Sequence, residues 1–355
     1  MQASAREGGH KGRPDVVRGS RCPRAGRIEM SSKAFLIGLL FAGVLNPVCL
    51  PAQDSACTQR TIAVGVVDRQ WNLVPNLSAA NFRGTLHGHE VQTLSAAVDT
   101  NPRRIVLLLD VSGSMTDKWR TEKSISEYLI KFSPTRASIA QMTFGERIID
   151  AAGFEQDRPE LLRLQALLFK ACEQGHHGGR TALYDAIARA RSSLGNPNVG
   201  DAIFALTDAG DNHSRIDEKK LEANLLSAGI RLFVTIIRMD KLPERARTPE
   251  GLYGPGQLRD LVEATGGMAL TVSQMGISPP LSHFHAKSGA EAVDLALQRL
   301  FGQMGEFYRL DVRLPETVEN PTKWKLEVTD AGGKPMRNVE VQYPQELIPC
   351  AQASH

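Results

Sequence analysis

This sequence has few cysteines and few aromatic residues: five Cys and an aromatic share of 6% in 355 residues. So few cysteines in so long a chain exclude a disulfide-dense scaffold, and the fold has to rest on an apolar core. A hydrophobic share of 42% is enough for such a core. Fixed-period repeats and low-complexity tracts are missing as well, which excludes solenoids and tandem arrays.

The chain also lacks an excess of basic residues beyond its first 33 residues. Its formal net charge is +3, but residues 1–33 alone hold eight Lys or Arg and three Asp or Glu, a net of +5. The remaining residues therefore carry −2. Because nucleic-acid-binding domains present strongly basic surfaces, we predict no nucleic-acid partner.

No run of apolar residues is long enough to cross a bilayer, which needs about 20 residues. Residues 34–45 form an uncharged apolar run that is too short for this, and no second long apolar run exists, so we expect no transmembrane anchor. Lys33 precedes this run and Ala52 offers a small residue for cleavage, as in a secretory signal peptide over about residues 30–52. Met30 is an alternative start of the chain. We predict a secreted or periplasmic protein.

Three of the five cysteines lie beyond this leader: Cys57, Cys172 and Cys350. Three thiols leave one unpaired. Cys57 and Cys350 lie near opposite ends of the mature sequence, so an oxidising compartment could join them if the ends meet in space. Their pairing is a hypothesis at this point.

Catalytic signatures are missing too. The sequence has no Gly-x-Ser-x-Gly elbow, no His-Glu-x-x-His helix, no phosphate loop and no Cys/His signature. His176 and His177 suggest zinc, but no third ligand has suitable spacing. His283 and His285 lie in the segment Gly276–Gly289, which we predict to be a solvated surface loop. We predict that the protein is not an enzyme.

One stretch does carry chemistry. The apolar run Ile105–Asp110 predicts a buried strand that ends at an aspartate, and Ser112 and Ser114 follow at alternate positions. Oxygens at these three positions of a tight loop can converge on one point. A carboxylate and two hydroxyls are hard ligands, which suit Mg²⁺, Ca²⁺ or Mn²⁺ and are poor ligands for zinc or copper.

Two distant segments offer further ligands. Thr181 follows two glycines just before an amphipathic helix, and Asp208 follows a second apolar strand. Together the three segments resemble the metal-ion-dependent adhesion site of von Willebrand factor type A domains. The matching metal-ligand positions are Asp110, Ser112, Ser114, Thr181 and Asp208.

This resemblance implies a role for each position. Ser112 and Ser114 would ligate the ion directly, Thr181 directly or through water, and Asp208 through water, while Asp110 would set the first loop. The ion is a divalent cation, with Mg²⁺ favoured and Ca²⁺ or Mn²⁺ as alternatives. One coordination position then faces solvent, and the Asp or Glu carboxylate of a partner protein can fill it.

The third loop departs from the family pattern. That family commonly has glycine directly after the aspartate, whereas here Ala209 follows Asp208 and the glycine is Gly210. Asp211 adds a carboxylate that would weaken docking if it entered the shell. Asp185 is better explained as a first-turn acid that the helix dipole favours than as a ligand.

Strand and helix signals alternate in the middle of the chain. Near-continuous apolar strands such as Asp201–Thr207 and Ile230–Ile237 are separated by amphipathic helices such as Lys118–Phe132. This pattern predicts an α/β fold with a Rossmann-like doubly wound, mostly parallel sheet, covered by helices on both faces. The resemblance implies the same fold, a von Willebrand type A domain.

Period-two patterns on both sides of this region predict antiparallel strands, for example Thr61–Asp68 and Phe307–Leu314. Neither segment is large enough to fold alone, so we expect them to pack into one small sandwich, a β-rich flanking module. The predicted division is a leader over 1–52, a β-rich lead-in over 53–100, a von Willebrand type A domain over 101–305 and a β-rich C-terminal segment over 306–355.

The leading hypothesis is thus an exported protein-binding module that recognises an acidic group through its bound cation. One alternative is an intracellular adaptor for an ATPase-driven maturation complex, which the leader disfavours. Another is a metal-assisted hydrolase, for which only His176, His177 and His213 are candidate bases.

Overall fold

A seven-stranded sheet forms the middle of the chain in the computed structural model, in the strand order β10-β9-β8-β7-β4-β5-β6. The model describes residues 57–350 except 175–177, 239–248, 274–275 and 279–288. The inner strands β5, β4, β7, β8 and β9 are parallel, and β6 and β10 pair antiparallel at the two edges. The strands are β4 (Arg104–Asp110), β5 (Ser138–Phe144), β6 (Ile148–Glu155), β7 (Ala202–Thr207), β8 (Arg231–Ile237), β9 (Ala269–Ser273) and β10 (Gly276–Ser278).

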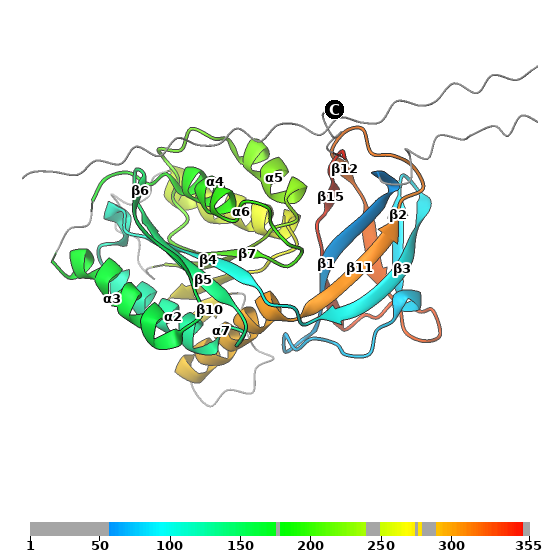
Figure 1. Cartoon of the computed structure of the whole chain (residues 1–355), viewed down its shortest axis with the longest axis horizontal. Coiled ribbons are helices and arrows are strands. Elements are labelled where there is room, and N and C mark those ends of the chain that lie inside the picture. Colours follow the sequence, from blue (N-terminus) through cyan, green and yellow to red (C-terminus); the bar gives the residue numbers. More distant parts are fainter. Residues whose placement is uncertain (1–56, 175–177, 239–248, 274–275, 279–288, 351–355) are drawn as a thin grey trace, which may run out of the picture. The chain divides into compact units, whose positions relative to one another are not determined.

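Helices cover both faces of this sheet, as Figure 1 shows. Alternate residues of β4 face opposite cores: Leu107 and Leu109 pack in one, and Val106 and Leu108 in the other. The first core is completed by α2 (Trp119–Phe132), α3 (Arg158–Glu173) and α7 (Gly289–Gly305). The second is completed by α4 (Leu183–Ser193), α5 (Glu218–Ser227) and α6 (Pro249–Ala264). The α/β prediction is confirmed in this coarser form, because β4 is buried on both faces and covered by helices on both.

The chain changes direction across the sheet at β4. From β4 it continues to β5 and β6 on one side, and then returns to build β7, β8 and β9 on the other side. The segments that follow neighbouring parallel strands come out at the same edge. In open α/β sheets the carboxyl edge at such a reversal is the usual place for a ligand.

Segments from both ends of the described chain build a second sheet. Its six strands lie in the order β13-β2-β3-β11-β1-β14, and all pairs are antiparallel. These strands are β1 (Gln59–Asp68), β2 (Phe82–Leu86), β3 (His89–Asp99), β11 (Phe307–Arg313), β13 (Lys325–Val328) and β14 (Val339–Gln342). β12 (Thr322–Lys323) and β15 (Glu346–Leu347) form a separate pair, and the 3-10 turns are η1 (Ala79–Asn81) and η2 (Gly113–Met115).

The β-rich flanking module from both termini is therefore present, but the expected sandwich is wrong. Strands of the two segments alternate within one sheet, where β11 lies between β3 and β1. The inward side chains of this sheet, among them Val64, Phe82 and Leu310, form one apolar core of their own. The period-two pattern identifies half-exposed strands, but it does not say which strands become neighbours.

The predicted surface loop Gly276–Gly289 is wrong in its first residues. Gly276–Ser278 form β10, which pairs antiparallel with β9. His283 and His285 lie outside the described residues, as do the leader over 1–52 and its signal peptide. No helix in the described ranges is both long and apolar enough to cross a membrane.

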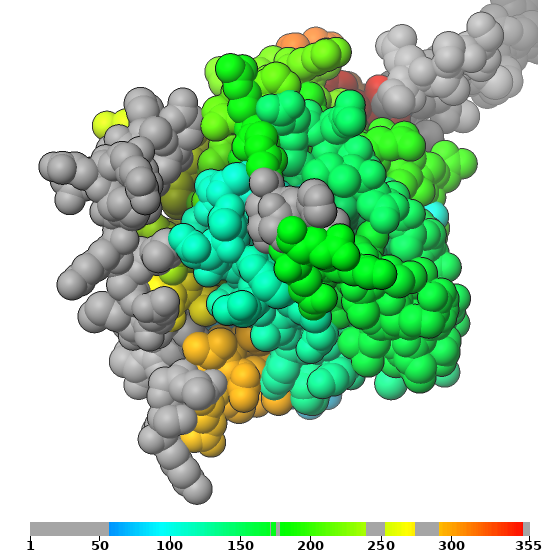
Figure 2. Space-filling view, turned by 90° about the vertical axis from the view of Figure 1, so that its left-hand side faces the viewer, coloured from blue at the N-terminus to red at the C-terminus, as the bar shows by residue number. Residues whose placement is uncertain are grey.

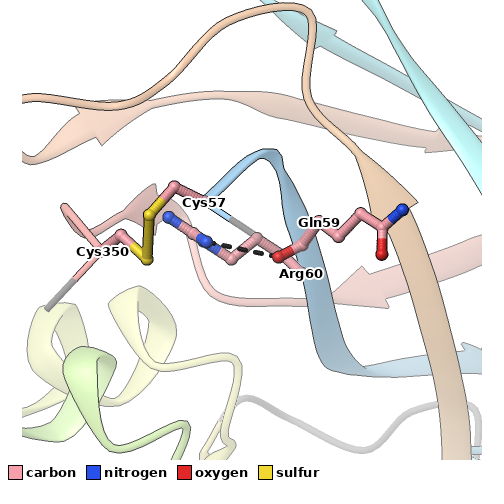
Figure 3. The surroundings of a disulfide bond; sticks show 4 residues. All are labelled: Cys57, Gln59, Arg60 and Cys350. Carbon is pink, nitrogen blue, oxygen red and sulfur yellow. Dashed lines mark hydrogen bonds between the residues drawn. A yellow bond between two sulfur atoms is a disulfide. The ribbon is translucent and has the colours of Figure 1, made fainter. Parts of the chain in front are cut away.

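Cys57 and Cys350 form a disulfide, as Figure 3 shows. Their Cα atoms are 5.5 Å apart although 293 positions separate them in the sequence. The hypothesis that Cys57 and Cys350 pair is confirmed. Cys172 is a free, buried thiol, and burial raises its pKa to about 11.

Candidate metal centre

The first predicted loop leaves the end of β4 as a tight turn. Asp110 is fully buried, and its Oδ1 accepts a hydrogen bond of 3.0 Å from the backbone N–H of Ser112. The chain then enters η2, so that the hydroxyls of Ser112 and Ser114 lie 3.2 Å apart. Ser112 is buried, whereas Ser114 is exposed. The turn therefore brings two hydroxyl oxygens together at the end of the strand, on the path from the buried carboxylate to the surface.

The Asp208 loop reaches the same edge because β7 lies beside β4 and runs parallel to it. Thr207, the last residue of β7, donates its hydroxyl proton to Oδ2 of Asp110 at 2.6 Å. The same hydroxyl oxygen accepts a hydrogen bond of 3.1 Å from the N–H of Ala209. This pair of bonds fixes the Asp110 carboxylate to the loop that carries Asp208.

The Thr181 loop is joined to both of the others through its backbone. The N–H of Gly113 donates to the carbonyl of Gly179 at 3.3 Å, and the N–H of Asn212 donates to the carbonyl of Thr181 at 3.0 Å. The side chain of Asn212 in turn accepts from the N–H of Thr181 at 3.0 Å. Figure 2 views this edge, where cyan atoms of the segment after β4 lie beside green atoms of the segment before α4.

A residue that the sequence analysis did not single out lies between two of the loops. The ammonium group of Lys118 donates to Asp208 Oδ2 at 2.7 Å and to the carbonyl of Ser114 at 2.9 Å. Both side chains of this ion pair are largely buried, with 10% of Lys118 and 14% of Asp208 exposed. Asp208 is thus tied to the first loop, and one cationic group already lies at the site.

The electrostatics of this cluster favour a further cation. Burial and the nearby charge of Asp208 raise the pKa of Asp110 to about 7. Glu122 on α2 is fully buried, and neither of its carboxylate oxygens has a hydrogen-bond partner of good geometry among the described residues. Burial and the charge of Asp110 raise the pKa of Glu122 well above its ordinary value. Three carboxyl groups thus lie close together with one lysine, and a cation would relieve their repulsion.

The chemistry of the donors fits a small hard cation. The predicted set holds two carboxylates and three hydroxyls and no sulfur or imidazole, which is the ligand type of Mg²⁺ and Ca²⁺. The described residues include no group of three or more His, Cys, Asp or Glu that could hold a metal. The predicted ligand set holds only two residues of these types, because its other three members are Ser and Thr. Its absence from that class of group is therefore expected. His176 and His177 lie outside the described residues.

Asp211 and Asp185, the two doubtful carboxylates, hold loops in place. Asp211 accepts the N–H groups of Tyr184 and Ser214 at 2.9 and 3.1 Å. Asp185 accepts the N–H groups of Arg215 and Ile216 at 3.1 and 3.0 Å. Each carboxylate is therefore engaged by the backbone at the start of α4 or beside it, which explains why the residues are there without a bound ion.

The third loop has an alanine, Ala209, directly after Asp208. Ala209 has a φ of 71°, in the left-handed region that glycine normally fills, and Gly210 does not have a positive φ. Ala209 is buried, and its carbonyl oxygen would lie 2.3 Å from a Cβ atom on Gly254. Position 209 thus takes a conformation that favours glycine, at the cost of a strained alanine.

No protein-family model and no curated protein matches the chain. One solved structure with a similar chain path is BatB from Bacteroides thetaiotaomicron, a conserved hypothetical protein. It is 15% identical to this chain, the match covers 57% of this chain and 98% of BatB, and the TM-score is 0.41. A von Willebrand factor type A protein from Catenulispora acidiphila is 13% identical over 83% of this chain and 73% of its own, with a TM-score of 0.39. The VWA domain of SpRpn10 is 14% identical over 57% and 98%, with a TM-score of 0.37. The assignment of the site stands on the chain's own residues.

Proposed function

We propose that this chain is an exported protein-binding module of the von Willebrand type A kind. It recognises an Asp or Glu carboxylate of a partner protein through a divalent cation at the candidate metal centre. Mg²⁺ is the favoured ion, with Ca²⁺ or Mn²⁺ as alternatives. Asp110, Ser112, Ser114, Thr181 and Asp208 are the proposed ligands.

The observation that carries this proposal is the meeting of three loops that lie far apart in the sequence. The loops after β4, before α4 and after β7 are hydrogen-bonded to one another at one edge of the sheet. The strand order supports a doubly wound reading, because the chain reverses across the sheet at β4, next to this edge. A ligand site is expected at such a reversal.

Each residue has a stated role in this proposal. Asp110 supplies a buried negative charge, which Thr207 and the N–H of Ser112 hold in orientation. Ser112, Ser114 and Thr181 offer neutral oxygens, so the ion keeps part of its positive charge. Asp208 is neutralised in part by Lys118 and acts from a greater distance. The bound ion supplies a Lewis-acidic position that accepts a carboxylate oxygen from the partner.

The disulfide supports export and disfavours the adaptor alternative. Disulfides persist in oxidising compartments and are rare in the cytosol. The bond joins Cys57, which precedes the strands of the central sheet in the sequence, to Cys350, which follows them. Such a bond is expected in a protein that folds after it has left the cytosol. A secreted or periplasmic location is the corresponding proposal, and the non-enzymatic role stays a prediction.

Titration calorimetry with Mg²⁺ and Ca²⁺ tests the proposal. Asp110→Asn is expected to weaken ion binding by about 100-fold or more, because even outer groups of a metal site are worth about 10–100-fold. Asp117→Asn is the matched control, since Asp117 is an exposed acid of the same loop and should leave the affinity unchanged. Equal affinity of the wild type and Asp110→Asn would refute the assigned site, and so would a wild type that binds neither ion.

A further inference from the structure

A hollow of about 370 Å³ lies beside the candidate metal centre, and three arginines line it: Arg147, Arg189 and Arg215. They come from three different elements, namely the turn between β5 and β6, helix α4 and the loop before α5. All three side chains are exposed. The hollow is therefore a place where separate parts of the fold bring positive charge together.

The hollow adjoins the Thr181 loop. Ala182, the residue after Thr181, belongs to its wall, and the N–H of Ala182 donates to the carbonyl of Gly145 at 2.8 Å. His213 lines it as well, and the N–H of His213 donates to the carbonyl of Thr181 at 3.1 Å. A partner that places one group on the ion thus has this hollow next to it.

The carboxylates of the hollow already accept hydrogen bonds from backbone N–H groups, whereas its guanidinium groups have no such partners. Glu146 accepts the N–H of Arg180 at 3.1 Å, and Asp185 accepts the N–H groups of Arg215 and Ile216. Within the described part of the chain, the side chains of the three arginines form no hydrogen bond and no ion pair. The wall therefore offers up to fifteen N–H donors, five on each guanidinium, and its own carboxylates take up none of them.

The net charge of the wall indicates what binds there. Three arginines and two carboxylates leave one positive charge. This charge matches a single carboxylate better than a phosphate, which carries between one and a half and two negative charges at neutral pH. The rest of the chain beyond residue 33 is slightly acidic at −2, so a general basic surface does not account for the arginines.

We propose that this arginine hollow is a second anchor, which binds an acidic side chain of the same partner segment that offers a carboxylate to the ion. The proposal rests on the proposed function, and it narrows the partner to a protein segment with at least two acidic residues. Arginine forks suit carboxylates because they can donate two parallel hydrogen bonds. One carboxylate coordinates the ion, and the other lies among the three guanidinium groups.

A labelled peptide of six glutamates is the probe, with binding followed by fluorescence anisotropy in Mg²⁺. We expect the full chain to bind this peptide and not a peptide of six glutamines. The triple variant Arg147→Gln, Arg189→Gln, Arg215→Gln should bind it about tenfold or more weakly, since three exposed charge pairs each contribute a modest amount. The control triple variant Arg83→Gln, Arg309→Gln, Arg337→Gln removes the same charge from exposed arginines of the β-rich module and should bind as the wild type does.

Mg²⁺ calorimetry on the same variants separates this inference from the proposed function. We expect the hollow variant to keep the wild-type Mg²⁺ affinity, so that only the second anchor is lost. Unchanged peptide affinity in the hollow variant would overturn the inference while leaving the metal centre intact. Binding of a phosphoserine peptide that depends on the arginines, without binding of hexaglutamate, would also overturn it. If wild-type protein takes up no Mg²⁺, the proposed function fails by that measurement alone.

Discussion

At the scale of single residues, the first turns of α2 set the charge around the candidate site. Lys118 pairs with Asp208, while Glu122, one turn further along the helix, is buried with no partner among the described residues. Lys118 brings a positive charge to the place where a cation is proposed to bind, and it engages one of the two proposed carboxylate ligands. We therefore expect Lys118 to limit the affinity of the ion.

Lys118→Met is predicted to raise the affinity for Mg²⁺ about five- to tenfold, as measured by calorimetry. The change removes a repelling charge and frees Asp208, and ~1 kcal/mol is a reasonable size for one charge pair near a protein surface. Lys123→Met is the control, because Lys123 lies on the same helix but pairs with Glu173 at 2.8 Å. Weaker Mg²⁺ binding by Lys118→Met would mean that the lysine supports the site rather than competing with the ion.

Ala209→Gly is predicted to change the free energy of unfolding by less than about 0.5 kcal/mol. Relief of the left-handed conformation, ~1–2 kcal/mol, offsets the lost methyl burial and the greater freedom of the unfolded chain. Ala205→Gly is the control, because Ala205 is equally buried in β7 without a positive φ and should cost about 1–2 kcal/mol. Urea unfolding of both variants gives the comparison. Equal losses would show that position 209 carries no conformational strain.

At the scale of elements, the sequence predicts the central strands and helices well because their apolar patterns are strong. Asp201–Thr207 is predicted as a strand and Ala202–Thr207 is observed, and Lys118–Phe132 corresponds to α2. The pattern fails where it is short or broken. β10 has only three residues, too few for a period, and α6 begins at Pro249 and continues through Pro255, a residue type that usually breaks a helix pattern.

The site shows the same division between local and tertiary information. Asp110, Ser112 and Ser114 are found from the sequence because their geometry is local to one turn. Thr207 and Lys118 were missed, since their roles depend on β7 lying beside β4 and on α2 packing against the same edge. The sequence does indicate Glu122, because this charged residue lies three positions before Ile125, on the buried face of α2. A charged residue on that face is an indication of a site.

At the scale of the whole molecule, the raised pKa of Asp110 links stability to pH. Its folded-state pKa of about 7 lies above the ordinary 3.8, so the folded chain keeps a proton that the unfolded chain loses. The corresponding stability is fully present below about pH 4 and is lost as the pH rises to about 7. The raised pKa of Glu122 acts in the same direction. Bound cation should offset this loss, because it favours the charged carboxylate.

The melting temperature in chelator is therefore predicted to fall between pH 5 and pH 8, and saturating Mg²⁺ should remove or reverse that fall. Calorimetric scans at several pH values measure both. The acids with lowered pKa values, such as Asp99 and Asp311, titrate below this window and do not confuse it. Asp110→Asn should flatten the slope in chelator, whereas Asp117→Asn should keep it. A wild-type melting temperature that is flat over this range would contradict the prediction.

The two sheets are joined by packing as well as by chain connections. The guanidinium carbons of Arg103 and Arg231 lie 4.6 and 4.3 Å from the ring centre of Phe307, the first residue of β11. Gly200 has a φ of +94°, and a Cβ atom there would lie 2.3 Å from this ring. The disulfide then links the segment just before β1 to the segment just after β15. A cross-link between such distant positions should stabilise the whole described unit.

Replacing Cys57 and Cys350 by serine is predicted to lower the free energy of unfolding by about 2–4 kcal/mol, because the bond restricts a very long loop in the unfolded chain. Thiol labelling checks the pairing in a chain whose Cys22 and Cys49 are serine. The folded protein should react at no thiol, since Cys172 is buried with a pKa of about 11, and the unfolded protein should react at one. Reductant should raise that number to three. Three reactive thiols in unfolded protein without reductant would refute the disulfide, and with it the main structural support for export.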